Sequence, residues 1–584
     1  MLRSPQRELS AAPACRFGYA PTCRKRHERE SPMVLFDFIL KEGGAKRNRL
    51  VAGAFLASLG SVLLLVVVNL AAAQIAGREE DRVDWLLALL FVVAALIYYL
   101  AENDLIRQIG AAMETAIDRV RMRLLDGVRA ADYAAIERVG SATLYESITQ
   151  ASNALSQNSQ FIALSIRSAV LTTMVLLYIL YLSPIAFFLV LAGTVAAGVM
   201  YSRLGGKLAK RYAAMMGEER QLFRSVSDLF DGFKEVRLSS VRSRDLAEGF
   251  DAVSDRSTTI RIEVQGKAFQ QLIFGHVAFF FLLAVVVFVV PTYAKGFATD
   301  VVKISAAVIF MIGPLGGVIQ AVAVMAAADA AAQRMLELDR QLAAMVEPGH
   351  GEAQEQVSPA FDEIRLCSAL YAYPAAVGEQ AFTVGPLDLR IHRGEVVFIT
   401  GGNGSGKSSF IKLLSGLYRP CHGYLEVDGQ VVGDHARRAY RELFAAVFSD
   451  HHLFRRLYGL PQQESAGVLQ EEAQRLLAWL EMDRVITLVG DTFSRIDLSS
   501  GQRKRALLVA ALLEQRPVLV LDEWAADQDP YFRRKFYREI VPALKSRGTT
   551  IIAVTHDDHY FDVADRRLHF EEGRMIEIKP GEGG

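Results

Sequence analysis

Long apolar runs alternate with polar segments in the part of the chain that precedes residue 343. A helix needs about 20 apolar residues to cross a bilayer, and slightly shorter runs cross with little tilt. Six runs meet this requirement, and they cover residues 50–76, 85–101, 161–182, 185–201, 272–290 and 304–326. The pattern therefore predicts a domain of six transmembrane helices within residues 33–343.

The polar segments between these runs differ in length and in charge. Three short joins carry few basic residues, whereas the long segment 203–267 is rich in lysine and arginine. Basic segments stay on the cytoplasmic side of a membrane. We therefore expect the long segments 102–160 and 202–268, together with both chain termini, to face the cytoplasm. Their three- and four-residue apolar spacing predicts that they extend the membrane helices.

The remainder of the chain divides into a tail, a linker and a second domain. Residues 1–32 are rich in arginine and lack an apolar run, which is typical of a disordered tail rather than a signal peptide. Residues 344–359 are polar and contain glycine and proline, and they predict a linker. Short β-rich runs then alternate with helical ones over 360–580. The expected fold class is multidomain, with a six-helix α-helical transmembrane domain followed by an α/β domain.

The composition is that of a membrane protein. Hydrophobic residues make up 51% of the chain, and the 65 basic and 65 acidic residues cancel to a net charge of 0. This balance does not indicate nucleic acid as a partner, and a lipid bilayer is the expected one. The cysteines lack the paired spacing of a zinc site and the density of a disulfide scaffold, so we expect no structural disulfide. They are Cys15, Cys23, Cys367 and Cys421.

A glycine-rich segment, GGNGSGKSS, follows the apolar run GEVVFIT and precedes a helical pattern. Glycines let the backbone fold around a phosphate, so that successive N–H groups and a helix N-terminus point at the anion. In this pattern Lys407 reaches the β- and γ-phosphates, and the Ser408 hydroxyl is a ligand of Mg²⁺. The segment predicts binding of ATP or GTP. The candidate binding residues are Gly401, Gly402, Asn403, Gly404, Ser405, Gly406, Lys407, Ser408 and Ser409.

Two further strands end in residues that suit phosphoryl chemistry. The run RPVLVLDE predicts a buried strand that ends at Asp522 and Glu523, at the edge where open α/β sheets bind ligands. Asp522 is the expected ligand of Mg²⁺, and Glu523 is placed to act as general base on the attacking water. The strand TTIIAVT ends at His556, a candidate to contact the γ-phosphate and to orient the water or Glu523.

The segment LSSGQ resembles the signature sequence of the ATP-binding cassette (ABC) family, and the phosphate loop, acidic strand and histidine extend this resemblance over about 360–580. In that family the signature of one domain closes on the ATP held by another. The resemblance implies four residues that bind ATP in trans, namely Ser499, Ser500, Gly501 and Gln502. Asp529 stands where the family's cross-dimer loop places an aspartate. Because the chain has one such domain, a homodimer with two composite sites is expected.

Four positions depart from the general ABC pattern or leave a choice open. The aromatic residue that stacks on adenine is expected to be Tyr373, with Tyr371 as a near alternative. Ser449 stands in place of the usual glutamine and is a further candidate for a contact to Mg²⁺. Ser500 replaces the first glycine of the signature, and Trp524 follows the expected base where smaller residues are common.

Six apolar runs followed by one cassette resemble an exporter-type half-transporter over residues 35–580. More narrowly, GGNGSGKSS, VFSDHHLF, DEWAADQDP and THDDHYFDVADR resemble the cyclic peptide exporter family, which includes pyoverdine, syringomycin and microcin exporters. The resemblance implies ATP-driven export of a cyclic or nonribosomal peptide, siderophore precursors included, across the bacterial inner membrane, with or without a periplasmic partner. A lipid or hydrophobic-drug exporter, a siderophore importer with an exporter fold and an ATP-gated channel stay open as alternatives.

Polar residues within the apolar runs are candidates for the cargo path. Asn69, His276 and Gln320 are the notable ones, although hydrogen bonds between helices explain such residues nearly as well. The segment FDGFKEVRLSS, residues 230–240, lies where ABC exporters dock a short transverse helix on the cassette. An ordinary solvated amphipathic helix is the alternative.

Overall fold

The computed structural model divides the chain into two compact units, which are described separately. One contains residues 27–127 and 141–343, and the other contains 128–140 and 344–584. The structure describes residues 34–44, 46–75, 84–289, 291, 301–349, 357–374, 381–460 and 466–578. The predicted tail, 1–32, and most of the predicted linker lie outside these ranges.

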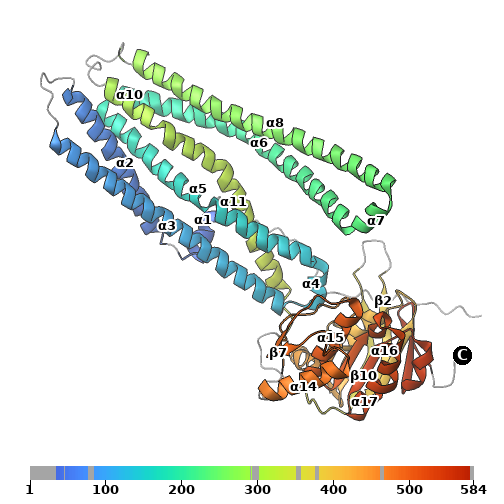
Figure 1. Ribbon diagram of the computed structural model, residues 1–584. Helices are drawn as coiled ribbons and strands as arrows, with labels where there is room; N and C mark the ends of the chain where they lie inside the picture. The colour runs from blue at the N-terminus through green and yellow to red at the C-terminus, as the bar shows by residue number, and fades with distance from the viewer. Residues whose placement is uncertain are drawn as a thin grey trace, which may run out of the picture. The chain divides into compact units, whose positions relative to one another are not determined.

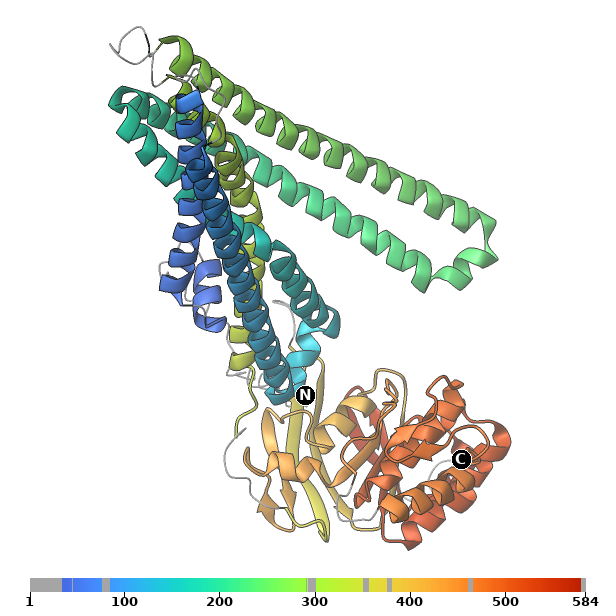
Figure 2. The same cartoon turned by 60° about the vertical axis from the view of Figure 1, so that its left-hand side comes forward.

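The first unit consists of long helices (Figures 1 and 2). Its main helices are α2 (Arg47–Ile75), α3 (Trp85–Ala130), α5 (Ser141–Leu182), α6 (Pro184–Asp231), α8 (Ser240–Ala284), α10 (Val301–Phe310) and α11 (Ile312–Ala344). Shorter elements are α1 (Val34–Asp37), η1 (Phe38–Glu42), α7 (Phe233–Leu238) and η2 (Val285–Val289).

Within the described residues, five helices are long and apolar enough to cross a membrane. They are Arg47–Gln74, Trp85–Ala130, Ser147–Leu182, Ser240–Val289 and Val301–Val318. The remaining predicted span coincides with the apolar first part of α6, Pro184–Met200, which is shorter. In the most apolar 18-residue stretch of α3, only 6% of the residues are buried inside the unit. The leucines and valines of this stretch therefore face outward, as side chains in contact with lipid do. The helical unit is a multi-pass membrane domain.

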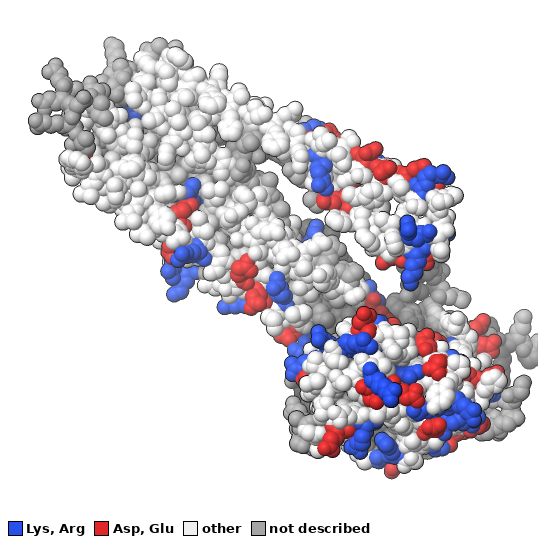
Figure 3. Space-filling model, viewed as in Figure 1, with Lys and Arg blue, Asp and Glu red and all other residues white. Residues whose placement is uncertain are grey.

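Charge is distributed along this domain as a membrane requires. On the face shown in Figure 3, one end of the helical domain is nearly free of charged side chains, and charges gather toward the other end and on the α6–α8 hairpin near α7. Charged groups avoid the hydrocarbon layer because their transfer from water is costly.

Helices α6 and α8 run side by side and are joined by α7 (Figures 1 and 2). Each long helix begins at a serine whose side chain accepts a backbone N–H, Ser183 for α6 and Ser239 for α8. Pro184 occupies the first turn of α6, where no hydrogen bond is lost. The segment predicted as a short transverse helix forms α7 at the turn of this hairpin.

The second unit is built around a six-stranded sheet with the order β12-β11-β3-β10-β9-β6. Its strands are β3 (Val396–Gly401), β6 (Phe444–Val447), β9 (Val518–Asp522), β10 (Thr550–Val554), β11 (Arg566–Glu571) and β12 (Arg574–Ile578). All neighbouring pairs are parallel except β11 and β12. An antiparallel sheet, β2-β1-β4-β5, and a two-stranded ribbon complete it. Their bounds are β1 (Glu363–Ala372), β2 (Thr383–His392), β4 (His422–Val427), β5 (Gln430–Val431), β7 (Leu488–Val489) and β8 (Thr492–Phe493).

Both faces of the parallel sheet are covered, which explains its continuous apolar strands. In β3, Val396 and Phe398 belong to one hydrophobic core, whereas Val397 and Ile399 belong to a second core on the opposite face. The helices of this unit are α4 (Tyr133–Val139), α12 (Lys407–Leu414), α13 (Arg437–Arg441), α14 (Ala466–Trp479), α15 (Ser500–Leu513), α16 (Pro530–Lys535) and α17 (Val541–Ser546), with η4 (Trp524–Asp527), η5 (Phe536–Ile540) and η6 (Asp558–Val563).

Helix α4 belongs to this second unit although the chain reaches it between α3 and α5. The backbone N–H of Asp132 donates to the Met345 carbonyl over 2.8 Å, and the Glu347 N–H donates to the Ala130 carbonyl over 2.9 Å. The Asp132 side chain also caps α4. Residues 102–160, expected to be mostly continuous helix, therefore contain a break whose short helix packs with the α/β domain.

Candidate functional site

The phosphate loop joins the end of β3 to the start of α12, as the sequence predicts. Gly401 has a φ of +140°, and a Cβ atom at this position would clash with the Phe570 carbonyl oxygen. Gly406, with a φ of +104°, precedes the first residue of α12. These conformations favour glycine and direct the N-terminus of α12 at the loop, which is the arrangement that binds phosphate.

The Lys407 ammonium lies within the loop. Its Nζ donates to the Gly401 carbonyl over 2.9 Å and to the Gly402 carbonyl over 2.8 Å. The side chain is buried, and the two carbonyl groups stabilise its positive charge beside the loop. A rotation of this flexible side chain is enough to reach a phosphate.

Asp522 and Ser408 meet at the edge of the sheet. The Ser408 hydroxyl donates to Asp522 Oδ2 over 3.3 Å, and Asp522 is buried. Burial raises the pKa of the Asp522 carboxyl, and hydrogen bonds from Ser449 act in the opposite direction. The structure thus brings all three predicted Mg²⁺ candidates, Ser408, Asp522 and Ser449, into one place.

This donor set suits Mg²⁺ when it is combined with phosphate oxygens. Magnesium prefers hard oxygen ligands and in nucleotide sites usually takes only one or two carboxylates from the protein. Among the residues the structure describes, no group of three or more His, Cys, Asp and Glu side chains could hold a metal ion. A site of one carboxylate and serine hydroxyls therefore fits magnesium held with a nucleotide rather than by a cage of protein ligands.

Glu523 lies one residue beyond β9 in a strained conformation. Its φ of +51° and ψ of +35° place a non-glycine residue in the left-handed region. Its side chain is 40% exposed, and Glu523 Oε1 lies 3.6 Å from His556 Nε2. The structure therefore brings the predicted base and the predicted histidine together at an edge that water can reach.

The signature segment, Ser499 to Gln502, starts helix α15. The Ser499 side chain accepts from the Gln502 N–H, and the Gln502 side chain accepts from the Ser499 N–H, which forms a capping box. Ser500 Oγ donates to Asp527 Oδ2 over 2.8 Å. A Cβ atom at Gly501 would lie 2.7 Å from the Asp527 carbonyl oxygen, so glycine is needed there.

The structure also reveals Lys504, a functional candidate that the sequence analysis does not name. Its Nζ donates to the Glu523 carbonyl and to Asp527 Oδ2, each over 2.8 Å, and Lys504 is only 5% exposed. In return, the Trp524 indole N–H donates to the Lys504 carbonyl over 2.8 Å. The basic run RKR after the signature is the sequence feature that contains this lysine. Only the fold shows that the lysine side chain turns inward, toward the end of β9.

Asp529 caps helix α16 and contacts Arg505. It accepts the Phe532 N–H over 2.9 Å and the Arg505 guanidinium over 2.8 Å. The backbone hydrogen bond from Phe532 and the charge of Arg505 lower the pKa of the Asp529 carboxyl. Arg505 also stacks 3.5 Å above the Phe532 ring, which fixes the loop that carries Asp529.

Of the two tyrosines proposed for adenine, Tyr373 faces the nucleotide site. Tyr373 and Phe382 line a hollow of about 360 Å³ together with the phosphate loop and Glu523. Tyr371 is buried and stacks on Tyr418 with 4.1 Å between ring centroids. Tyr371 is therefore a core residue, and Tyr373 keeps its proposed role.

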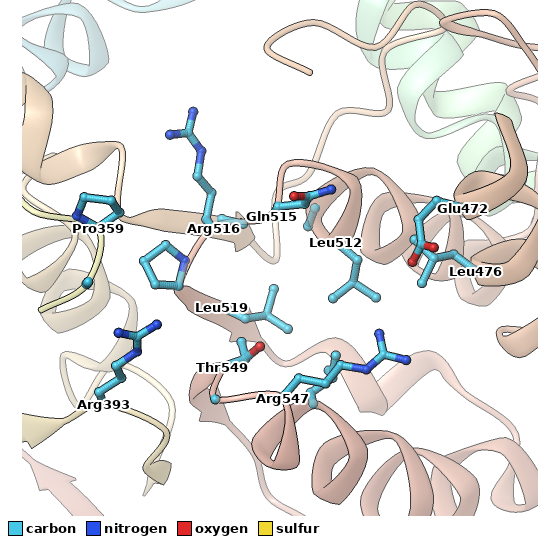
Figure 4. Close-up of a pocket in the computed structure, with 16 residues that line it drawn as sticks. Pro359, Arg393, Glu472, Leu476, Leu512, Gln515, Arg516, Leu519, Arg547 and Thr549 are labelled. Atoms are coloured by element: carbon cyan, nitrogen blue, oxygen red, sulfur yellow. The ribbon is translucent and has the colours of Figure 1, made fainter. Parts of the chain in front are cut away.

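A larger hollow, of about 500 Å³, lies elsewhere in this unit (Figure 4). It is lined by residues at the starts of β9 and β10, such as Leu519 and Thr549, and by Arg393, Arg516 and Arg547. Parallel strands carry their ligands at the opposite, carboxyl ends. None of the predicted nucleotide residues lines this hollow.

Of the three proposed cargo-path residues, Asn69 does not line the cavity that His276 lines. Asn69 is buried, and its Nδ2 donates to the Tyr178 hydroxyl over 3.1 Å and to the Lys303 carbonyl over 3.3 Å, as the packing interpretation expects. His276 lines an apolar cavity of about 210 Å³ formed by α6, α8 and α11. The side chain of Gln320 lies outside the described residues.

The sequence analysis does not name a charged pair that joins the predicted third span to the residue after the predicted second span. Arg167 Nη1 lies 2.8 Å from Glu102 Oε1, and it donates to the Tyr98 hydroxyl over 3.1 Å. Both charged side chains are mostly buried. Arg167 interrupts the apolar run 161–182, so the signal was present in the sequence, because a charge at membrane depth requires a partner.

Together, the fold and the site define an ATPase domain joined to a multi-pass membrane domain. Residues 384–526 match the family described as ABC transporter. The chain is 34% identical over 414 residues to "ATP-binding protein SyrD" of Pseudomonas syringae pv. syringae, with 68% of this chain and 71% of that protein covered. It is 24% identical over 528 residues to "ATP-dependent lipid A-core flippase" of Paraburkholderia xenovorans, with 86% and 84% covered.

A solved structure shares the fold over most of the chain. The structure of a bacterial Atm1-family ABC exporter with ATP bound superposes with a TM-score of 0.73 at 16% identity, and it covers 91% of this chain and 94% of its own. The 34% identity to SyrD over two thirds of both proteins shows that the chain belongs to the ABC transporter family. It is an ABC exporter that binds ATP and couples its hydrolysis to transport.

Proposed function

We propose that this protein exports a cyclic or nonribosomal peptide, siderophore precursors included, across the bacterial inner membrane as a homodimer. The observation that carries the cargo class is the cavity that His276 lines in the membrane domain. Its lining is mainly apolar and small, with Gly193, Ala197 and Gly316 among the residues, and Gln271 adds a polar group. A lining of this kind suits the apolar groups of a largely uncharged cargo. The strings that resemble cyclic peptide exporters point to the same class.

The division of the nucleotide site supports the homodimer. The phosphate loop and the signature segment occur once each in this chain, and a composite site takes the phosphate loop from one copy and the signature from the other. In such a dimer the N-terminus of α15 and the Ser499 hydroxyl face the γ-phosphate bound by the partner. Both groups carry N–H or O–H donors that stabilise negative charge.

Hydrolysis in this proposal depends on residues at the carboxyl edge of the sheet. Lys407 and the loop N–H groups hold the β- and γ-phosphates, and Ser408 and Asp522 would hold Mg²⁺, with Ser449 beside them. When bound, Mg²⁺ neutralises charge on the phosphate oxygens. Glu523 accepts a proton from the attacking water, and His556 orients that water or the Glu523 carboxylate. Tyr373 stacks on the adenine.

Alternating access follows if the dimer closes on ATP and reopens after hydrolysis. The chain connects the ATPase unit to the membrane helices through α4 and after α11, and α7 lies at the turn of the α6–α8 hairpin. We place the ATPase domain, α7 and both termini in the cytoplasm because the basic segments lie on that side.

Stimulation of ATPase activity by cargo tests this function. In proteoliposomes we expect an uncharged cyclic lipopeptide to stimulate hydrolysis at lower concentrations than a lipid A-core glycolipid or a hydrophobic cationic drug does. Gly316→Leu places a larger side chain in the cavity. It should raise the peptide concentration for half-maximal stimulation about tenfold, because the cargo loses the burial of nearly two methylene groups. If no cyclic peptide stimulates ATP hydrolysis, the proposal is contradicted.

Gly313→Leu is the matched control for this experiment. Gly313 and Gly316 belong to the same helix, and a Cβ atom at either position meets nothing within 4 Å. Gly313 does not line the cavity, so its leucine variant should respond to peptide as the wild type does.

Lipid flipping is the second candidate function. The similarity to a lipid A-core flippase extends over 528 residues, and an apolar cavity also suits an acyl chain. A stronger response to the glycolipid than to every peptide would favour this function over the first.

A further inference from the structure

A chain of hydroxyl groups connects the nucleotide site to helix α4. The Tyr418 hydroxyl donates to Glu137 Oε2 over 2.6 Å, and Lys412 Nζ donates to Glu137 Oε1 over 2.8 Å. The Tyr418 and Tyr373 hydroxyl oxygens are 3.2 Å apart, and the Tyr373 oxygen is 2.8 Å from Ser409 Oγ. We call Ser409, Tyr373, Tyr418 and Glu137 the hydroxyl chain. Its first two members belong to the ATP site, and its last belongs to α4.

The carboxylate fixes the direction of every bond in the hydroxyl chain. A hydroxyl group carries a single proton. Tyr418 gives its proton to Glu137, so Tyr373 must donate to Tyr418. The Tyr373 proton is then occupied, and Ser409 must donate to Tyr373. All three protons therefore point from the phosphate loop toward α4, and loss of the carboxylate removes the reason for this order.

The surroundings keep the hydroxyl chain rigid and in one protonation state. Tyr418 is fully buried between Tyr371, stacked at 4.1 Å, and Tyr373, which meets it edge-on at 6.0 Å. Burial and the bond to Glu137 raise the pKa of Tyr418 well above its usual value. Burial acts to raise the pKa of Glu137, but bonds from Lys412 and Tyr418 outweigh it and lower that pKa. At neutral pH the Glu137 carboxylate is therefore charged, and Tyr418 keeps the proton that it donates to Glu137.

We propose that Glu137 is a positioning residue for ATP, which acts through Tyr418 on Tyr373 and Ser409 and so makes the affinity for ATP depend on the position of α4. A rotated Tyr373 ring presents a different face to the adenine, and a reversed Ser409 hydroxyl changes the donors at the phosphate loop. Because α4 lies in the chain between the membrane helices α3 and α5, a displacement of those helices changes the affinity for nucleotide.

Two single substitutions and one control substitution test this inference on the full-length protein in proteoliposomes. Tyr418→Phe removes one hydroxyl and keeps the ring, and Glu137→Gln removes the charge and keeps the shape. Each should raise the KM for ATP about tenfold, the size expected for a hydrogen bond to a charged group, and change kcat less than about twofold. Tyr371→Phe is the control, because this ring packs in the same cluster but its hydroxyl is not part of the hydroxyl chain. The KM of this variant for ATP should equal that of the wild type.

A double variant distinguishes a connected chain from general damage. If the two residues act in series, Glu137→Gln combined with Tyr418→Phe should be no worse than either single variant. Additive losses, an unchanged KM in both single variants, or a lower kcat at unchanged KM would each overturn the inference. The affinity of the same variants for a fluorescent ATP analogue can also be measured without cargo. That measurement does not depend on transport, so it tests the inference even if the protein exports no peptide.

Discussion

The Glu523→Gln variant should bind ATP as the wild type does and hydrolyse it about 10²- to 10⁴-fold more slowly, the range expected for loss of a general base. The amide keeps the size of the side chain, and it cannot accept the proton of the attacking water. Glu523 is the more exposed carboxylate, one residue beyond β9 and 3.6 Å from His556, whereas the neighbouring Asp522 is buried against Ser408. This geometry is why we propose Glu523 for proton transfer and Asp522 for metal binding.

Single-turnover hydrolysis and nucleotide-binding measurements check this expectation together. Asp558→Asn is a suitable control, because Asp558 is an exposed carboxylate two residues from His556 and its side chain is 76% accessible. The control should retain the wild-type rate. A Glu523→Gln protein that hydrolyses ATP at that rate would show that another group is the base.

The Lys504→Met variant should lower kcat about 10²-fold with little change in ATP binding. Lys504 donates to the carbonyl of Glu523, a residue held in the left-handed region, and it also pairs with Asp527. Hydrogen bonds from Lys504 and Ser500 lower the pKa of the Asp527 carboxyl. Methionine fills the space but donates nothing, so Glu523 loses a fixed backbone contact. A displacement of about 1 Å at a catalytic group is enough for a loss of this size.

Lys504→Gln separates positioning from overall stability. A glutamine amide can donate to the Glu523 carbonyl, so this variant should recover much of the lost kcat, whereas the melting temperatures of the two variants should be similar. Equal kcat values for the methionine and glutamine variants would mean that the hydrogen bond to Glu523 does not position the base.

Local patterns in the sequence were enough to predict that the candidate nucleotide residues lie together. The phosphate loop, Asp522, Glu523 and His556 each follow a short buried strand, and parallel strands bring their carboxyl ends to one edge. No further information was needed to place them together. The helical membrane domain followed by an α/β ATPase domain was equally predictable, because long apolar runs leave few alternatives to membrane helices, and this expectation is confirmed.

Tertiary contacts determined the features that the sequence did not predict. The periodicity of 102–160 indicates helix, but nothing in it shows that Ala131, just before α4, pairs with Val346 or that Glu137 of α4 binds Lys412. Lys504 belongs to the basic run RKR, and only the fold shows that its ammonium donates to the Glu523 carbonyl. Both features depend on contacts between residues that are far apart in the sequence.

Uptake of a labelled cyclic peptide into inverted membrane vesicles tests the central claim most directly. We predict uptake that requires ATP, proceeds against a concentration gradient and disappears in the Glu523→Gln variant. Uptake that persists in that variant, or intact ATP hydrolysis without movement of any cyclic peptide, would contradict a role as an ATP-driven peptide exporter.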